Sequence, residues 1–220
     1  MTIDWEQGAA RARERFEDGA ARLPEDTDER QRQLTRMGNA AWAAGLSYLM
    51  LGRRDCANDW LVRAAETYRR SWPDAPAGSW GRPIGAMKSR LIAGDLLGAE
   101  EDARWTLDAG TAESASPIGR YAAALAQLIL GEDDAAEALA TTLTDAEAIP
   151  HAVSNSITAL ATRDAPAYQA AIEALVADFE SRAEFLEEIA VADTVLALQA
   201  LAKVREMSVP LASALLPDPT

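Results

Sequence analysis

The side chains most often used in catalysis are scarce in this chain. His151 is the single histidine and Cys56 the single cysteine among 220 residues. A nucleophile with a histidine base, or a zinc site, needs several such groups brought together. The sequence contains no HExxH, no CxxC and no phosphate-binding glycine loop. We therefore expect His151 to lie on the surface and Cys56 to pack as a small thiol, and we expect neither a metal nor a cofactor.

Paired carboxylates are the next candidates for chemistry, because the chain has three groups of them: Glu100–Asp102, Asp133–Asp134 and Glu187–Glu188. General acid–base catalysis needs two carboxyl groups that face each other across a cleft in unlike environments. Neighbours on a helix point about 100° apart, and each group stands near an expected helix start, where acids stabilise the helix dipole. We interpret them as solvated faces and predict a protein without enzymatic activity.

Tryptophan and arginine point to binding instead, because both are enriched at binding hot spots and arginine stacks on indole rings. Five of the six tryptophans lie between residues 42 and 105, in a stretch that is also rich in arginine. We expect Trp42 and Trp60 to fill the core and the stretch to contact a protein or peptide. The candidate partner-binding residues are Arg69, Trp72, Trp80, Arg82, Lys88 and Arg90.

Net charge narrows the class of partner. Thirty-five acids against 21 bases give a charge of -14, which disfavours nucleic acid and anionic membranes as partners. The excess is concentrated in residues 111–220, which hold 17 acids and 5 bases. Only Lys88 and Lys203 are lysines, and such a composition fits either a GC-rich genome or a protein adapted to high salt.

The lengths of the apolar segments bear on the cellular location of the protein. The first residues lack the apolar stretch of a secretory signal, and no apolar run is long enough to span a bilayer. A lone thiol is also consistent with a reducing compartment. We expect a cytoplasmic protein of unknown oligomeric state.

Helical periodicity runs through nearly the whole sequence. Apolar residues recur at the spacing of one helix face, and no run of β-branched residues alternates as a strand would. The pattern predicts an all-α fold of about ten helices. They are expected at 3–22, 28–51, 55–71, 80–93, 96–109, 117–130, 133–144, 150–162, 165–183 and 190–206.

Four of the expected helix pairs share a turn, at Gly52, Gly94, Gly131 and Arg163. Positions ten, six and three residues before each turn hold eleven apolar residues and Lys88, which places them on one stripe of each first helix. Such equivalence indicates a two-helix repeat. If the pairs stack in register, the leucines three residues before the turns must be buried: Leu49, Leu91, Leu128 and Leu160.

The first of these pairs, residues 38–71, resembles the tetratricopeptide repeat. Its small, aromatic, turn and alanine positions are matched by Gly45, Tyr48, Gly52, Ala57, Leu61 and Ala64. The later pairs keep less of the motif, and the turn spacing departs from the regular period of that family. An irregular helical bundle therefore remains the alternative to a stacked array.

The resemblance implies a single domain of stacked antiparallel helix pairs over residues 29–183. Residues 1–28 would then form an N-terminal capping helix, 184–207 a C-terminal helix and 208–220 an extended tail. In such arrays the first helix of each pair lines a concave face, which here would carry the apolar stripe, with Lys88 as the place for an acidic ligand group.

An open face this apolar would promote aggregation. Either the helix at 3–22 fills it through Trp5 and Phe16, closing the array into a compact bundle, or an amphipathic helix of a partner does.

A second resemblance concerns the C-terminal third. The segments Asp178–Arg182, Ala192–Ala202 and Leu215–Pro217 resemble all-helical bacterial immunity proteins of the Imm49 type. That resemblance implies a protein that neutralises a basic toxin through charge complementarity of its acidic half. The sequence thus leaves two functions open, a non-enzymatic protein- or peptide-binding module and an immunity protein.

Overall fold

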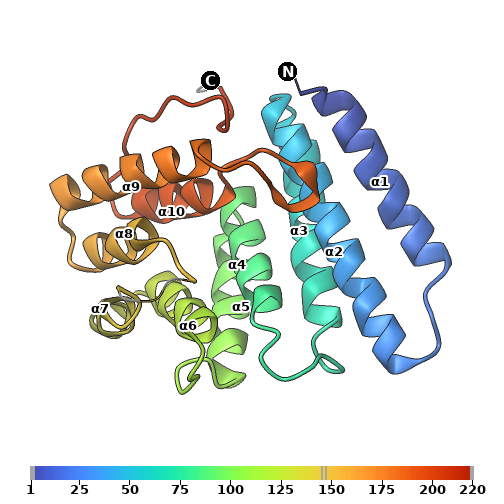
Figure 1. Cartoon of the computed structure of the whole chain (residues 1–220), viewed down its shortest axis with the longest axis horizontal. Coiled ribbons are helices and arrows are strands. Elements are labelled where there is room, and N and C mark those ends of the chain that lie inside the picture. The colour runs from blue at the N-terminus through green and yellow to red at the C-terminus, as the bar shows by residue number, and fades with distance from the viewer. Residues whose placement is uncertain (1–2, 145, 147, 219–220) are drawn as a thin grey trace.

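The computed structural model describes residues 3–144, 146 and 148–218, and all the regular secondary structure in this part of the chain is helical, as the periodicity predicts (Figure 1). Ten α-helices and one short 3-10 helix, with no β-strand, are found in these residues, and their ends differ from the expected ranges by only a few residues. The elements are α1 Trp5–Ala21, α2 Thr27–Met50, α3 Arg54–Arg70, α4 Gly81–Ala93, α5 Leu96–Asp108, α6 Pro117–Leu130, α7 Asp133–Thr141, α8 His151–Ala161, α9 Ala165–Glu180, η1 Leu186–Glu188 and α10 Asp193–Val204.

Aspartate side chains begin four of the helices. Asp4, Asp26, Asp95 and Asp164 each accept a hydrogen bond from the backbone N–H three residues later, at 2.9 to 3.0 Å. The bond satisfies one of the N–H groups that a first helical turn leaves unpaired, and the carboxylate stabilises the positive end of the helix dipole. Part of the acidic composition therefore serves the starts of α1, α2, α5 and α9.

The four turns that align in the sequence have the same backbone geometry. Gly52, Gly94 and Gly131 have φ angles of 71°, 76° and 75°, and Arg163 has a φ angle of 58°. In each turn the next residue donates its N–H to the carbonyl five residues earlier, at 2.9 to 3.0 Å. This closure ends a helix on a left-handed residue. The chain therefore contains four helix pairs with equivalent turns, from α2–α3 to α8–α9.

Each helix packs against the next one along the chain, and the first helices α4, α6 and α8 of consecutive pairs also pack against one another. The predicted apolar stripe lies in this packed region. Stacking in register requires buried leucines three residues before each turn, and these side chains are at most 3% exposed: Leu49, Leu91, Leu128 and Leu160.

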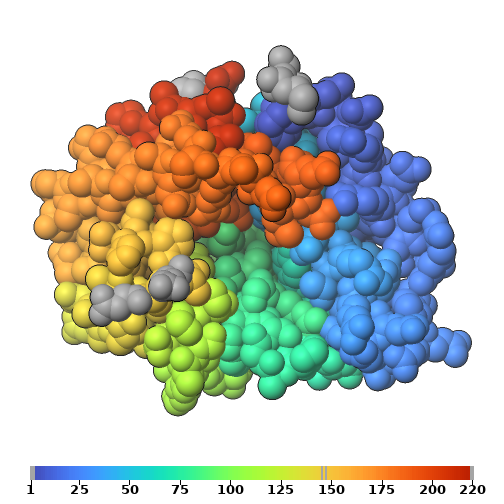
Figure 2. All heavy atoms as spheres, viewed as in Figure 1, coloured from blue at the N-terminus to red at the C-terminus, as the bar shows by residue number. Residues whose placement is uncertain are grey.

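The helix α10 covers the part of the stripe that lies on α4 and α8. After α9, residues 181–192 run across this face to α2, which η1 contacts, and the chain then returns as α10 (Figures 1 and 2). α10 packs against α4, α8 and α9, with Val195, Leu198 and Leu201 buried. Two apolar surfaces of one chain therefore remove each other from water.

Of the two occupants that the sequence leaves open for the apolar face, the helix at 3–22 does not lie there. α1 instead packs against α2 at one end of the molecule, where the Phe16 ring meets Trp60 edge-on with 5.4 Å between ring centres (Figure 1). The loop between α1 and α2 is short, so α1 stays beside α2 and α3 at this end of the molecule. The longer segment 181–192 allows α10 to return to the middle of the array.

The tail after α10 contains no helix in its described part and lies against the body of the protein. Leu216 is buried, and the backbone N–H of Ala192 donates to the Leu215 carbonyl at 2.9 Å. Gln199 of α10 also donates to the Val209 carbonyl through its side chain. The tail thus forms hydrogen bonds with α10 and with the residue before it.

Candidate functional site

Lys88, the one charged residue of the apolar stripe, is paired within the chain. Its Nζ lies 2.5 Å from Asp193 Oδ2 and donates to Thr194 Oγ1 at 2.9 Å. The two side chains of the ion pair are 12% and 14% exposed. Because a largely buried charge needs an opposite charge beside it, Asp193 at the start of α10 supplies here the acidic group that the sequence suggested a ligand would bring.

Arg205 holds the other end of α10. Its guanidinium donates to the Leu128 carbonyl at 2.7 Å and to Asp133 Oδ1 at 2.8 Å. The first contact satisfies a carbonyl at the end of α6, and the second adds a charge-assisted bond. α10 is therefore fastened at both ends over the apolar stripe.

A cleft opens beside the covered part of the stripe, between α2, α4 and the segment that precedes α10. Its volume is about 440 Å³, which is in the range of small ligand sites. We call it the aromatic cleft because three aromatic side chains line it together with the Lys88–Asp193 pair. The residues that matter for its chemistry are Trp42, Tyr68, Trp80, Arg82, Lys88 and Asp193.

Tyr68 reaches this cleft from α3 because two glycines leave room for its ring. A Cβ at Gly38 of α2 would lie 2.7 Å from the ring, and a Cβ at Gly85 of α4 would lie 2.8 Å from it. The Tyr68 hydroxyl donates to Asn39 Oδ1 at 2.8 Å. Burial, and then the negative charges of Asp193 and Glu187, raise the pKa of Tyr68 well above its ordinary value. The hydroxyl therefore stays a hydrogen-bond donor.

Sequence reasoning missed Tyr68 as a site residue. The available signal was a pair of glycines inside predicted helices, at Gly38 and Gly85, where glycine costs stability unless another side chain needs the space.

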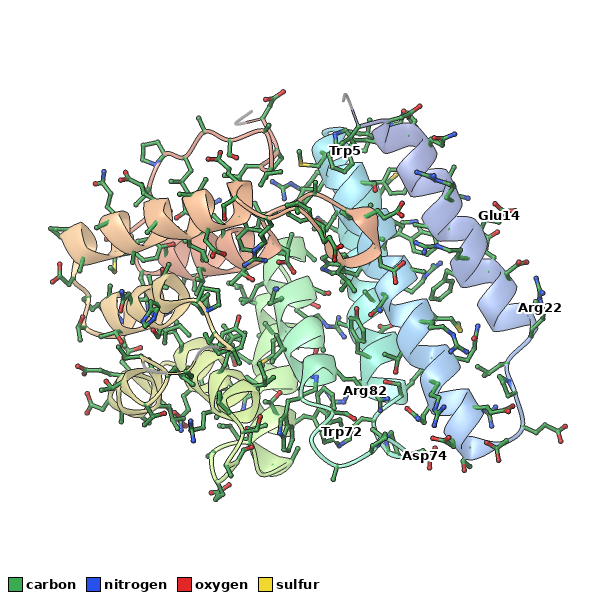
Figure 3. All side chains as sticks on the ribbon, viewed as in Figure 1. Trp5, Glu14, Arg22, Trp72, Asp74 and Arg82 are labelled. Atoms are coloured by element: carbon green, nitrogen blue, oxygen red, sulfur yellow. The ribbon has the colours of Figure 1, made fainter. Side chains whose placement is uncertain are left out.

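Trp80 precedes α4 and is partly exposed in the aromatic cleft. Trp72 supports it from the α3–α4 loop, with 5.6 Å between the two ring centroids, and meets Trp105 edge-on at the same separation. Figure 3 shows Trp72 beside Arg82 at this end of the molecule. Trp72 therefore orients Trp80 without lining the cleft itself.

Arg82 lines the aromatic cleft, but its guanidinium serves the fold. It is 8% exposed, donates to the Ser71 carbonyl at the end of α3 at 2.8 Å, and donates to Gln31 of α2. Burial lowers the pKa of Arg82 from its ordinary value. Arg82 thus joins the first turns of α2 and the end of α3 to the start of α4. It is also among the residues that line the cleft.

Arg69 and Arg90 lie outside the aromatic cleft, in a network around the buried Asp102 of α5. Arg69 Nη1 lies 2.9 Å from Asp102 Oδ1, and Arg90 binds both Asp102, at 3.4 Å, and Asp95, at 2.7 Å. Arg69 also covers the Trp105 ring at 5.2 Å. Burial raises the pKa of Asp102, and the two arginines offset only part of this effect. The network joins α3, α4 and α5.

The six candidate residues therefore separate into two groups. The structure brings Trp80, Arg82 and Lys88 together in one cleft, whereas Arg69, Trp72 and Arg90 do not line it. The lining residues that sequence reasoning did not select include Asn39, Tyr68 and Asp193.

The remaining single residues lie as follows. His151 is exposed at the start of α8, as expected. Cys56 is exposed as well, which contradicts the expectation that it packs, because it stands on the solvent side of the first turn of α3. Trp42 is buried as predicted, while Trp60 is only partly buried, with Arg63 over its ring at 4.6 Å.

The described residues contain no group of three or more acids, cysteines or histidines placed to hold a metal, and none of their helices combines the length and apolarity needed to cross a bilayer. Comparison with protein-family models, with curated proteins and with solved structures finds no match. A functional assignment for this chain therefore depends on its own side chains.

Proposed function

We propose that the chain is a non-enzymatic module that binds a peptide segment of a protein partner in the aromatic cleft. The observation that carries this proposal is the composition of the cleft: Trp42, Tyr68 and Trp80 form its apolar walls, and the Lys88–Asp193 pair supplies polar contacts. Aromatic walls with a few fixed polar groups favour the insertion of one anchor side chain. The resemblance to tetratricopeptide repeats supports the same class of function.

The ligand chemistry follows from these walls. Aromatic walls favour an aromatic or long aliphatic side chain as the anchor, and the Asn39 amide and the Lys88–Asp193 pair offer polar contacts to the neighbouring peptide groups. The exposed thiol Cys56 is consistent with work in the reducing cytoplasm.

A randomised peptide display library tests the proposal against the full-length protein. We expect enriched peptides to share an aromatic or aliphatic anchor and to lose about tenfold or more in affinity for Trp80→Ala. Trp105→Ala is the matched control, because Trp105 belongs to the same tryptophan cluster but does not line the cleft. Enrichment of peptides that bind wild type and Trp80→Ala equally well would contradict the proposal.

The second candidate function, an immunity protein, is favoured by the poor pairing of acids in the C-terminal half. Residues 111–220 hold 17 acids and 5 bases, and in the described part of this half the ion pairs engage four acids: Asp133, Asp178, Glu187 and Asp193. The uncompensated carboxylates would attract a basic toxin. A neighbouring gene for a secreted protein with a toxic C-terminal domain, and rescue of its toxicity by co-expression, would support this function over the first.

A further inference from the structure

A second cleft opens at the opposite ends of α2 and α4 and is independent of the aromatic cleft. Its volume is about 640 Å³, and it lies between the α2–α3 turn, the end of α4, α10 and the tail. The two clefts share no lining residue. Its floor is apolar, formed by Leu91, Ile92, Leu196, Ala200 and Pro217.

The charge of this second cleft is opposite to that of the whole chain. Arg54 at the start of α3 and Lys203 in the last turn of α10 line it, and no acidic side chain does so among the described residues. Both cations are exposed. In a chain of net charge -14, two cations from distant elements over an apolar floor favour a ligand that joins a carboxylate to apolar groups.

Some sequence neighbours of the lining residues are exposed apolar side chains. Leu97, three residues after Gly94, is 77% exposed and Leu96 is 40% exposed, while Val204 next to Lys203 is 58% exposed. The helices that border the cleft therefore also carry uncovered apolar side chains.

We propose that the second cleft binds the C-terminal end of a peptide, with its last apolar side chains on the floor and its terminal carboxylate between Arg54 and Lys203. A peptide suits the site better than a plain hydrocarbon chain because the Ser208 side chain interrupts the apolar lining. A serine hydroxyl can donate to and accept from peptide groups.

The probe is the fluorescein-labelled peptide Gly-Ser-Gly-Ala-Leu-Leu-Val, prepared with a free carboxylate and, separately, with a C-terminal amide. Fluorescence anisotropy with the full-length protein measures both affinities. We expect the carboxylate form to bind at least about tenfold more tightly, because the neutral amide forms no ion pair with the two cations. The difference should shrink as salt is added.

Two exposed substitutions locate the carboxylate. Arg54→Gln and Lys203→Gln together should remove the difference between the acid and the amide, whereas Arg30→Gln, an exposed arginine that lines neither cleft, should leave it unchanged. Trp80→Ala should also leave it unchanged, which separates this site from the aromatic cleft.

Four results would overturn the proposal. The first is equal affinity of the two peptide forms, and the second is no binding up to about 1 mM, the range of weak ligands. The third is an equal loss of affinity in Arg30→Gln. The fourth is binding of sodium decanoate without binding of the peptide, which would assign the cleft to fatty acids.

Discussion

Arg163 adopts a backbone conformation that glycine adopts at the three equivalent turns. A residue other than glycine is strained in this left-handed region, at a cost of roughly 1 kcal/mol in stability. The contacts of the Arg163 side chain offset little of this cost. Its one ion pair, with Asp133 at 3.4 Å, is largely exposed, and exposed pairs contribute little stability.

We therefore predict that Arg163→Gly stabilises the protein by about 0.5–1 kcal/mol despite the greater chain entropy of glycine. The reverse change, Gly94→Ala, should destabilise it by about 1 kcal/mol. Urea unfolding followed by circular dichroism measures both. Arg163→Ala is the control, because it removes the ion pair but keeps the strained backbone. If Arg163→Ala stabilises the protein as much as Arg163→Gly, backbone strain is not the cause.

The buried carboxyl group of Asp102 makes the free energy of unfolding depend on pH. Burial raises its pKa above the ordinary 3.8 in spite of two arginines, so the folded protein binds a proton at Asp102 more readily than the unfolded chain does. The stability that this group contributes is then complete below pH 3.8 and is lost as the pH rises through the raised pKa.

We predict that the free energy of unfolding of the wild type, relative to Asp102→Asn, decreases as the pH rises from about 3.8. Chemical denaturation of both proteins at a series of pH values measures the difference. A difference that instead increases with pH would show that Arg69 and Arg90 outweigh burial at this carboxylate.

At the scale of elements, α10 belongs to the core although its packing partners α4, α8 and α9 all precede it in the sequence. Its residue Leu198 is 1% exposed. We predict that Leu198→Ala destabilises the protein by about 3 kcal/mol, as cavities in packed cores do, while Leu97→Ala, at a site 77% exposed, changes stability by less than about 0.5 kcal/mol. Guanidinium unfolding measures both. Similar values for the two variants would show that α10 is loosely attached.

The elements themselves could be predicted because their signals are local. Apolar spacing, Gly52, Gly94 and Gly131 at the turns, and prolines near helix ends are all contained within a few neighbouring residues. The partner of α10 could not be predicted this way. Its apolar periodicity marks a buried face, but the Lys88–Asp193 and Arg205–Leu128 contacts join residues far apart in the sequence.

The same distinction explains the site. Residue type selected Trp80, Arg82 and Lys88, which do meet in one cleft, but it also selected Arg69 and Arg90 because hot-spot composition does not distinguish a surface arginine from one that neutralises a buried acid. Only the fold shows that Arg69 and Arg90 both form ion pairs with Asp102.

The whole molecule is strongly acidic, and its carboxylates repel one another at low salt. With a net charge of -14, self-repulsion opposes the compact state until ions screen it. If the acidity reflects adaptation to high salt, the melting temperature should rise steadily from dilute buffer to molar KCl. Calorimetry in KCl measures this, and NaCl at equal concentration controls for specific ion effects. Equal melting temperatures throughout would exclude the adaptation.

Because α10 follows in the sequence all the helices that it covers, its position has a consequence for biosynthesis. During translation α4, α8 and α9 leave the ribosome before α10, so the apolar surfaces that α10 covers stay in contact with water until α10 has left the exit tunnel. A nascent chain stalled before Asp193 would expose these surfaces to chaperones, and the release of α10 from the tunnel would bury them.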